Sequence, residues 1–234
     1  MNRFVLLCAM LVTAGCATSL PQVPPAGISA QVVAPAARAG DRWTYASRDG
    51  YTGISQDSID YRVTSVQGDE VTVEVQRGGR QSIERYTREG NWRERPMTNL
   101  QNFRYDPAYP AFTFPLEAGK TWQTYVKATD PATGSTYRVR IDGKVMGWDK
   151  VKVPAGEFDA IVVQRQVYAG NADTFRGEET ILEADWYAPR IGAIVRRSAT
   201  SSYLDKRSSC SSMNCSPWIN SGWTISELES HGGR

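Results

Sequence analysis

Two strand-turn-strand patterns in the second half of the chain restrict its fold more than any other feature. The first spans residues 151–163, where alternating valines stop at Pro154 and Gly156 can adopt the positive φ of a tight turn. The second spans residues 185–195 and is interrupted at Pro189. Proline cannot donate a hydrogen bond to a sheet ladder, so a strand ends at each proline. Both patterns predict hairpins.

The same alternation extends over the rest of the domain. Residues 59–77 predict a hairpin with its turn at Gln67–Glu70, and further turns near Gly78 and Gly90 extend it into a meander. Strands are predicted again at 120–128, 136–142 and 144–153, the last two joined by a two-residue turn at Asp142-Gly143. We predict an all-β fold: one antiparallel, strongly curved sheet, or a half-barrel or sandwich, of about ten strands.

The alternation lapses between Met97 and Gly119, where prolines and aromatic residues accumulate. Such a connection either packs over a sheet face or lines a groove, and packing is the simpler interpretation. A cavity lined by large side chains would instead hold a ligand. The candidate contact residues for a ligand or partner are aromatic: Trp43, Tyr45, Phe112, Phe114, Trp122 and Trp186.

The N-terminus reads as an export signal. Arg3 precedes an apolar run that is much shorter than the roughly 20 residues needed to span a bilayer. The run ends in Leu11-Val12-Thr13-Ala14-Gly15-Cys16, which resembles the bacterial lipobox, although Thr13 stands where leucine is usual. The resemblance implies cleavage after residue 15 and diacylglycerol and palmitate on Cys16. Multiple acyl chains would anchor the protein stably. A plain secretory signal cut nearby is the alternative.

The sequence around Cys16 also predicts location and domain limits. Ala17 follows Cys16, which by resemblance to Gram-negative sorting rules implies the outer membrane, on its periplasmic side. Residues 16–40 are rich in proline and alanine and predict an acylated, disordered tether. The β domain is expected at 41–205. Residues 206–234 are expected to be a C-terminal extension with a frayed tail.

Four cysteines occur in the chain. Cys8 would leave with the signal peptide and Cys16 would carry lipid. Cys210 and Cys215 remain, in an oxidising compartment, so we predict a local disulfide that pins residues 206–234. A redox or metal site would more often use a C-x-x-C spacing.

The search for catalytic chemistry argues against an enzyme. His231, the one histidine, is the fourth residue from the end, which argues against a histidine-dependent triad or zinc site. Alternation places Glu179, Glu183 and Asp185 on one strand face. We interpret them as a solvated surface that faces Arg165 or Arg138 across strands. A carboxylate-based hydrolase is the alternative. We expect no metal and no cofactor.

Balanced charge speaks against nucleic acid as a partner. The chain has 27 Lys and Arg against 25 Asp and Glu, and no basic run forms a patch.

Three segments, Phe114–Trp122, Val153–Ala160 and Trp186–Gly192, resemble in their order the signatures of the TapB-like group, a family of bacterial envelope proteins of unknown function. The resemblance covers roughly residues 40–205, and Arg190 stands where the family commonly has glycine. It implies a curved antiparallel sheet, similar to the half-barrel of periplasmic lipoprotein carriers. It supplies no catalytic residues.

The sequence therefore predicts a non-enzymatic, outer-membrane-anchored periplasmic lipoprotein that acts as a binding or structural component of the cell envelope. Its expected partners are the membrane, through Cys16, and an envelope protein or hydrophobic ligand. The alternative is a periplasmic carrier that holds a lipid or another hydrophobic ligand on a concave sheet face.

Overall fold

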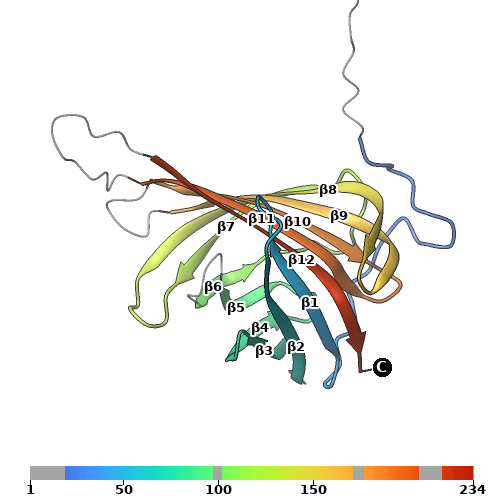
Figure 1. The fold of residues 1–234 in the computed structure, drawn as a ribbon, viewed down its shortest axis with the longest axis horizontal. Coiled ribbons are helices and arrows are strands. Elements are labelled where there is room, and N and C mark those ends of the chain that lie inside the picture. The colour runs from blue at the N-terminus through green and yellow to red at the C-terminus, as the bar shows by residue number, and fades with distance from the viewer. Residues whose placement is uncertain (1–18, 97–101, 171–176, 206–217, 234) are drawn as a thin grey trace, which may run out of the picture.

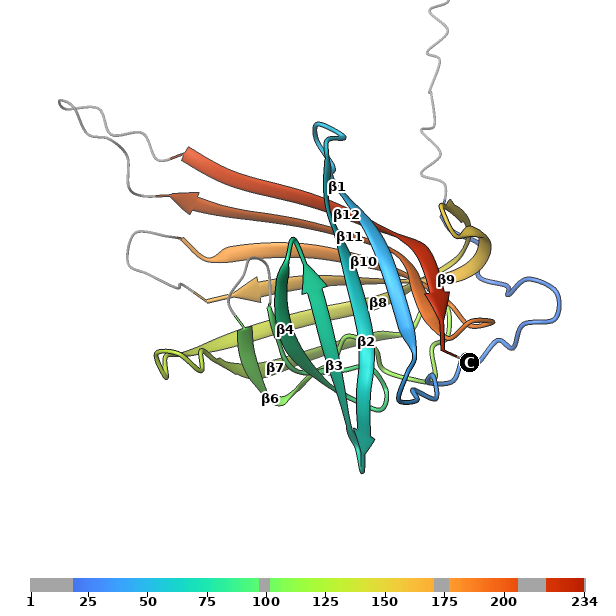
Figure 2. The same cartoon turned by 60° about the horizontal axis from the view of Figure 1, so that its bottom comes forward.

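The chain forms a closed antiparallel β-barrel. The computed structural model describes residues 19–96, 102–170, 177–205 and 218–233. Within these ranges each strand pairs with the next in sequence, and β12 pairs with β1 to close the barrel (Figure 1, Figure 2). The strands are β1 (Arg42–Asp49), β2 (Ser55–Gln67), β3 (Glu70–Arg77), β4 (Arg80–Thr87), β5 (Trp92–Pro96), β6 (Asn102–Tyr109), β7 (Thr121–Thr129), β8 (Thr136–Val153), β9 (Gly156–Ala169), β10 (Glu179–Ala188), β11 (Ala193–Asp205) and β12 (Trp218–Gly232).

The prediction of an all-β antiparallel fold is confirmed, but its finer form was wrong. The sheet is neither a half-barrel nor a sandwich of about ten strands, because twelve strands of the described residues close into one barrel. Closure pairs the two strands that would otherwise be sheet edges, β1 and β12. Within the described ranges no helix has the length and apolar character to cross a membrane.

The strand that closes the barrel comes from the predicted C-terminal tail. β12 pairs with β11 on one side and with β1 on the other, where His231 lies opposite Trp43. The predicted end of the β domain at residue 205 and the frayed tail are therefore wrong for residues 218–232. Ile225 and Leu228 of β12 are buried, and the polar residues around them hide the alternation of a strand.

The predicted turn at Asp142-Gly143 is also wrong, because residues 136–153 form one long strand, β8. Gly143 pairs with Trp122 of β7. A Cβ atom on Gly143 would lie 2.0 Å from Cε2 of Trp122, so the indole occupies the space of the missing side chain. Gly143 thus provides room for an aromatic neighbour, which a turn motif cannot reveal.

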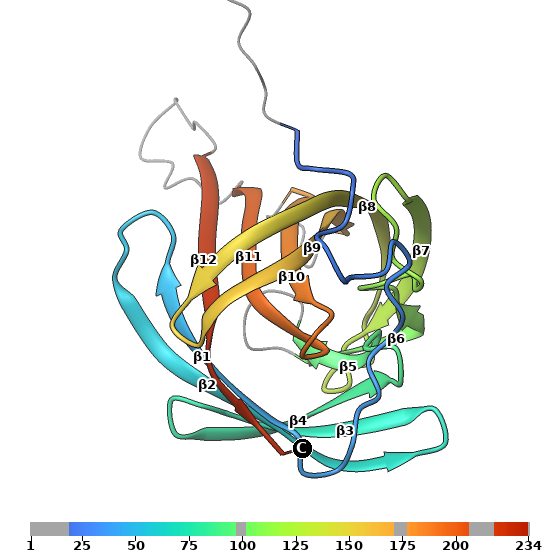
Figure 3. The same ribbon diagram turned by 90° about the vertical axis from the view of Figure 1, so that its right-hand side faces the viewer.

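The turn predicted near Pro154 is confirmed, and the hairpin it makes has a second role. The tip of β8–β9 folds over the outer face of β10–β12 (Figure 3). There Ala155 N–H donates to the carbonyl of Leu228 at 2.9 Å. A small apolar cluster lies beneath the tip and consists of Val151, Val153, Ala160, Ala188, Val195 and Leu228.

Apolar packing fills the part of the barrel that β6–β9 enclose. This main cluster includes Tyr109, Leu116, Ile141 and Val163, each of which is completely buried. The inward-facing side chains of β1–β4 form a separate, smaller cluster around Val63 and its neighbours on β2 and β3. A cavity lies between the two clusters.

The N-terminal segment is packed against the barrel from Pro21 onward. Val32 is only 3% exposed and exchanges two backbone hydrogen bonds with Leu116. Trp148 N–H donates to the carbonyl of Pro21 at 2.8 Å, and the chain then runs along the barrel (Figure 3). The predicted disordered tether is therefore wrong for residues 19–40: an extended, proline-rich chain has free backbone groups that pair with the barrel.

Candidate functional site

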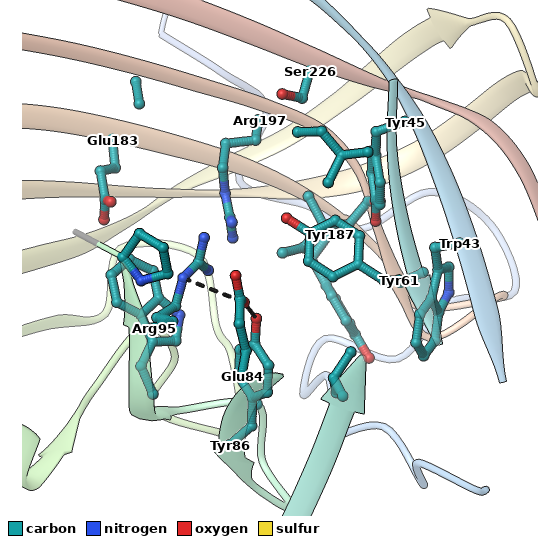
Figure 4. A pocket seen from close by; sticks show the side chains of 18 of the residues that line it. Trp43, Tyr45, Tyr61, Glu84, Tyr86, Arg95, Glu183, Tyr187, Arg197 and Ser226 are labelled. Carbon is teal, nitrogen blue, oxygen red and sulfur yellow. Dashed lines mark hydrogen bonds and ion pairs between the residues drawn. The ribbon is translucent and has the colours of Figure 1, made fainter. Parts of the chain in front are cut away.

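The candidate site is the cavity inside the barrel, with a volume of about 700 Å³. Its wall comes from β1–β5 and from β10–β12, with two aromatic residues from the β6–β7 connection (Figure 4). Pockets for small molecules usually have volumes of about 300–1,000 Å³, so the cavity suits one small ligand rather than a polymer.

The structure brings together four of the six aromatic residues predicted as ligand contacts. Trp43, Tyr45, Phe112 and Phe114 line the cavity. Tyr45 is held by its hydroxyl group, which donates to the carbonyl of Ile194 at 2.7 Å. Phe112 and Phe114 lie with ring centroids 5.6 Å apart and also contact Tyr187. The connection after β6 thus packs against the sheet and lines the cavity as well.

The other two predicted aromatic residues lie elsewhere. Trp122 packs against the filled core over Gly143. Trp186 packs against the cluster beneath the β8–β9 tip, and its Nε1 donates to Asp149 at 2.7 Å. Strand alternation explains the second case, because Trp186 lies between the inward-facing residues Asp185 and Tyr187.

The interpretation of Glu183 and Asp185 as a solvated surface was wrong, whereas the predicted partner Arg165 was right. Both carboxylates are buried inside the barrel, and their strand neighbour Arg165 is completely buried. Arg165 Nε donates to Glu183 at 2.8 Å and its Nη2 to Asp185 at 2.6 Å. Arg197 of β11 also donates twice to Asp185, at 2.6 and 3.1 Å. These charged side chains face inward because they lie on the same strand faces as apolar residues that face inward.

The ion pairs with Arg165 and Arg197 determine the charge state of Asp185. Burial by itself would raise the pKa of Asp185, but Arg197 and Arg165 outweigh burial and lower that pKa to about 2. Tyr109 donates to Glu183 at 2.8 Å, and burial raises the pKa of its hydroxyl well above the usual value. The network is therefore an anionic carboxylate held between arginines, with a neutral tyrosine at its edge.

A second polar group, formed by Glu84, Tyr86 and Arg95, was not found from the sequence. The Tyr86 hydroxyl donates to Glu84 Oε2, and Arg95 Nε lies 3.7 Å from the same oxygen (Figure 4). The guanidinium of Arg95 stacks on Trp92, 4.1 Å from the ring centroid. Glu84 and Tyr86 are two residues apart on β4, which is the one available signal that they share a face.

The cavity wall changes along β1 from aromatic side chains to a hydroxyl group. Its cavity-lining residues run from Trp43 through Tyr45 to Ser47. Ser47 lies across from Ser226 of β12, with the hydroxyl oxygens 3.4 Å apart. One part of the cavity is thus aromatic and another carries hydroxyl groups, an arrangement suited to an amphipathic ligand.

A smaller cavity of about 520 Å³ adjoins the first. It lies under the N-terminal segment between Ile28 and Arg38, and both cavities share the side chains of Pro35 and Tyr187. The segment predicted as a tether therefore forms part of the cavity wall.

Several predicted sites fall outside the described residues. These are the signal peptide, the lipidation site Cys16, and the cysteine pair Cys210 and Cys215, so lipidation and the disulfide stay predictions. Within the described ranges, no group of three or more His, Cys, Asp or Glu side chains is arranged to hold a metal ion.

Fold and cavity together define a closed antiparallel barrel with an internal, partly charged pocket. No family model and no curated protein matches the chain, so the resemblance to the TapB-like group stays a prediction. Among solved structures, the chain is similar to a protein from Parabacteroides distasonis that is provisionally described as a lipoprotein. The TM-score is 0.50 at 16% identity, over 86% of this chain and 99% of that one. This similarity supports the barrel fold.

Two further solved structures are similar at lower scores. One is an exported protein from Bacteroides fragilis, also provisionally described, with a YmcC-like fold: TM-score 0.47 and 17% identity, over 86% of this chain and 99% of that one. The other is the hypothetical lipoprotein YmcC from Escherichia coli: TM-score 0.45 and 10% identity, over 81% and 84%.

Proposed function

We propose that this protein is an exported, non-enzymatic binding protein of the cell envelope that holds one small amphipathic molecule inside its barrel. The observation that carries the proposal is the cavity of about 700 Å³, whose wall combines aromatic rings with charged and hydroxyl-bearing side chains. Trp43, Tyr45, Phe112 and Phe114, four of the residues predicted as ligand or partner contacts, border this space.

The carboxylates support binding rather than hydrolysis. Glycoside hydrolysis needs one carboxyl group that donates a proton and a second that acts as base or nucleophile. Asp185 accepts hydrogen bonds from both Arg165 and Arg197, and its pKa of about 2 keeps it ionised. Glu183 shares Arg165 and accepts from Tyr109. Both carboxylates thus serve as fixed partners of buried cations.

The proposal includes an anchor at Cys16 in the outer membrane, facing the periplasm. Its support is the lipobox-like sequence together with the position of Pro21, which already contacts the barrel at Trp148. Five fully extended residues span at most about 17 Å. An acylated Cys16 would therefore hold the barrel close to the bilayer, and the wall segment between Ile28 and Arg38 would lie near the anchor in sequence.

Native mass spectrometry of the full chain, purified from membranes in mild detergent, tests the proposal. We expect a bound species of small-molecule mass that organic extraction removes. Ala199→Trp places a large side chain on the cavity wall and should abolish this species. Leu182→Trp is the control, because Leu182 is 38% exposed on the outside of the barrel. The proposal is contradicted if the bound species persists in Ala199→Trp. It is also contradicted if the wild type carries no such species and binds none of the amphiphiles added to it.

A further inference from the structure

Three buried or nearly buried arginines border the barrel interior, and they differ in how their donors are used. Arg165 donates from Nε to Glu183, from Nη1 to the carbonyl of Ala111 and from Nη2 to Asp185. Arg197 donates from Nε and Nη2 to Asp185. Both guanidinium groups are therefore held by acceptors of the protein itself.

Arg95 is different. Its side chain is only 11% exposed and its Nε is buried. Nevertheless this nitrogen has no hydrogen-bond acceptor in the part of the chain that the structure describes. Glu84 Oε2 lies 3.7 Å from this nitrogen, beyond hydrogen-bond distance, and that oxygen already accepts from Tyr86. Arg95 has a charge neighbour but lacks the directed hydrogen bond that a buried donor requires.

The position of Arg95 is well defined even without such a bond. Its guanidinium stacks on Trp92 at 4.1 Å and approaches Tyr86 at 6.0 Å from the ring centroid. Stacking on an aromatic ring orients the planar group and leaves its edge free for acceptors. Arg95, Trp92 and Tyr86 all line the cavity, and Figure 4 shows Arg95 beside Tyr86 and Glu84.

We propose that Arg95 anchors an anion subsite, in which its guanidinium binds the carboxylate or phosphate oxygens of the ligand's head. This deepens and rests on the proposed function, because the subsite is part of the same cavity. The fork of N–H donors on a guanidinium matches the oxygens of a carboxylate or phosphate, and such charge-assisted bonds are stronger than neutral ones.

Other side chains of the wall accommodate an apolar tail. Val71 and Val73 lie on β3, next in the sheet to β4, which carries Glu84 and Tyr86, and Val63 lies one strand further, on β2. Phe112 and Phe114 border the cavity from the connection after β6. The preferred ligand is thus a single-chain amphiphile with an anionic head.

Glu84 gives the subsite a testable property. Its carboxylate is beside the guanidinium and would repel an incoming anion. Glu84→Gln removes this charge but keeps an oxygen that can accept from Tyr86. If Arg95 only served to neutralise Glu84, this change would not strengthen anion binding.

The test is a tryptophan-fluorescence titration of the full-length protein with three probes of equal chain length: dodecanoate, dodecyl phosphate and neutral dodecan-1-ol. We expect at least one anionic probe to bind roughly tenfold or more tightly than the alcohol, and the better of the two identifies the head group. Arg95→Met should remove this preference while the affinity for the alcohol is kept. Glu84→Gln should increase the preference. Far-UV circular dichroism checks the fold of each variant.

Two results separate the subsite from the cavity. If the alcohol and the anions bind the wild type equally, or if Arg95→Met and Glu84→Gln leave the preference unchanged, the subsite is refuted and the cavity function stands. If none of the probes binds, the proposed function fails and the subsite fails with it.

Discussion

Arg165 of β9 and Asp185 of β10 meet inside the barrel, where Arg165 Nη2 donates to Asp185 Oδ2 at 2.6 Å and both side chains are completely buried. The same carboxylate also binds Arg197, so one anion ties three neighbouring strands together. A buried ion pair contributes little compared with an apolar core, but removing one partner leaves an uncompensated charge.

We predict that Asp185→Asn destabilises the protein by about 3–5 kcal/mol, because Arg197 would lose its carboxylate partner and the buried Arg165 would keep only Glu183. Urea denaturation measures the change. Asp142→Asn is the matched control, since Asp142 pairs with Arg140 at the surface, where such pairs contribute about 0–1 kcal/mol. Equal losses in the two variants would contradict this account.

Stability should also depend on pH through Asp185. Its pKa is about 2 in the folded protein and about 3.9 in an unfolded chain, so the unfolded state takes up protons first as the pH falls. The stabilisation is complete above pH 5 and decreases toward pH 2 by about 2 kcal/mol. The difference in unfolding free energy between wild type and Asp185→Asn should therefore shrink over this range. A difference independent of pH would show that Asp185 is not the group responsible.

Val32 and Val33 test the docking of the N-terminal segment. Val32 is buried and bridges to Leu116, whereas Val33 is 73% exposed. Val32→Asp would bury a charge and should release the segment. We expect trypsin cleavage after Arg38, followed by mass spectrometry, to become roughly tenfold faster or more, because cleavage tracks the opened population. Val33→Asp should cleave like wild type. If both variants behave alike, Val32 does not hold the segment.

Gly143→Ala should destabilise the barrel by about 1–3 kcal/mol, since the new methyl group would displace the ring of Trp122. Near-UV circular dichroism reports the indole and urea denaturation the stability. Gly232→Ala, where a Cβ atom meets nothing within 4 Å, should change stability by less than about 0.5 kcal/mol. A silent Gly143→Ala variant would mean that the close approach is unimportant.

The strand pattern was largely predictable because a strand needs only local alternation and a turn residue. The hairpin at Gln67–Glu70 and the turn at Pro154 lie where the sequence places them. The prediction of a turn at Asp142-Gly143 was wrong because Gly143 leaves room for the indole of Trp122, a residue far from it in sequence. The prediction of a disordered tether at residues 19–40 was wrong for a similar reason: only the contact with Leu116 reveals that Val32 is buried.

The candidate site was predictable only in part. Four of the six chosen aromatic residues border the cavity: Trp43 and Tyr45 share one face of β1, whereas Phe112 and Phe114 come from the connection after β6. Arg95 and Glu84 were missed, since an isolated charge on a meander strand looks the same whether it faces water or a closed interior.

Sequence alone determined that the chain forms antiparallel strands, because alternation and turn residues act within a few positions of one another. Only the tertiary structure decided which face of each strand is inside, since that depends on β12 returning to β1 and closing the barrel. Closure buries Arg165 and Asp185 and leaves a space beside Arg95. Burial and cavity volume are properties of the whole sheet, and no local stretch of residues encodes them.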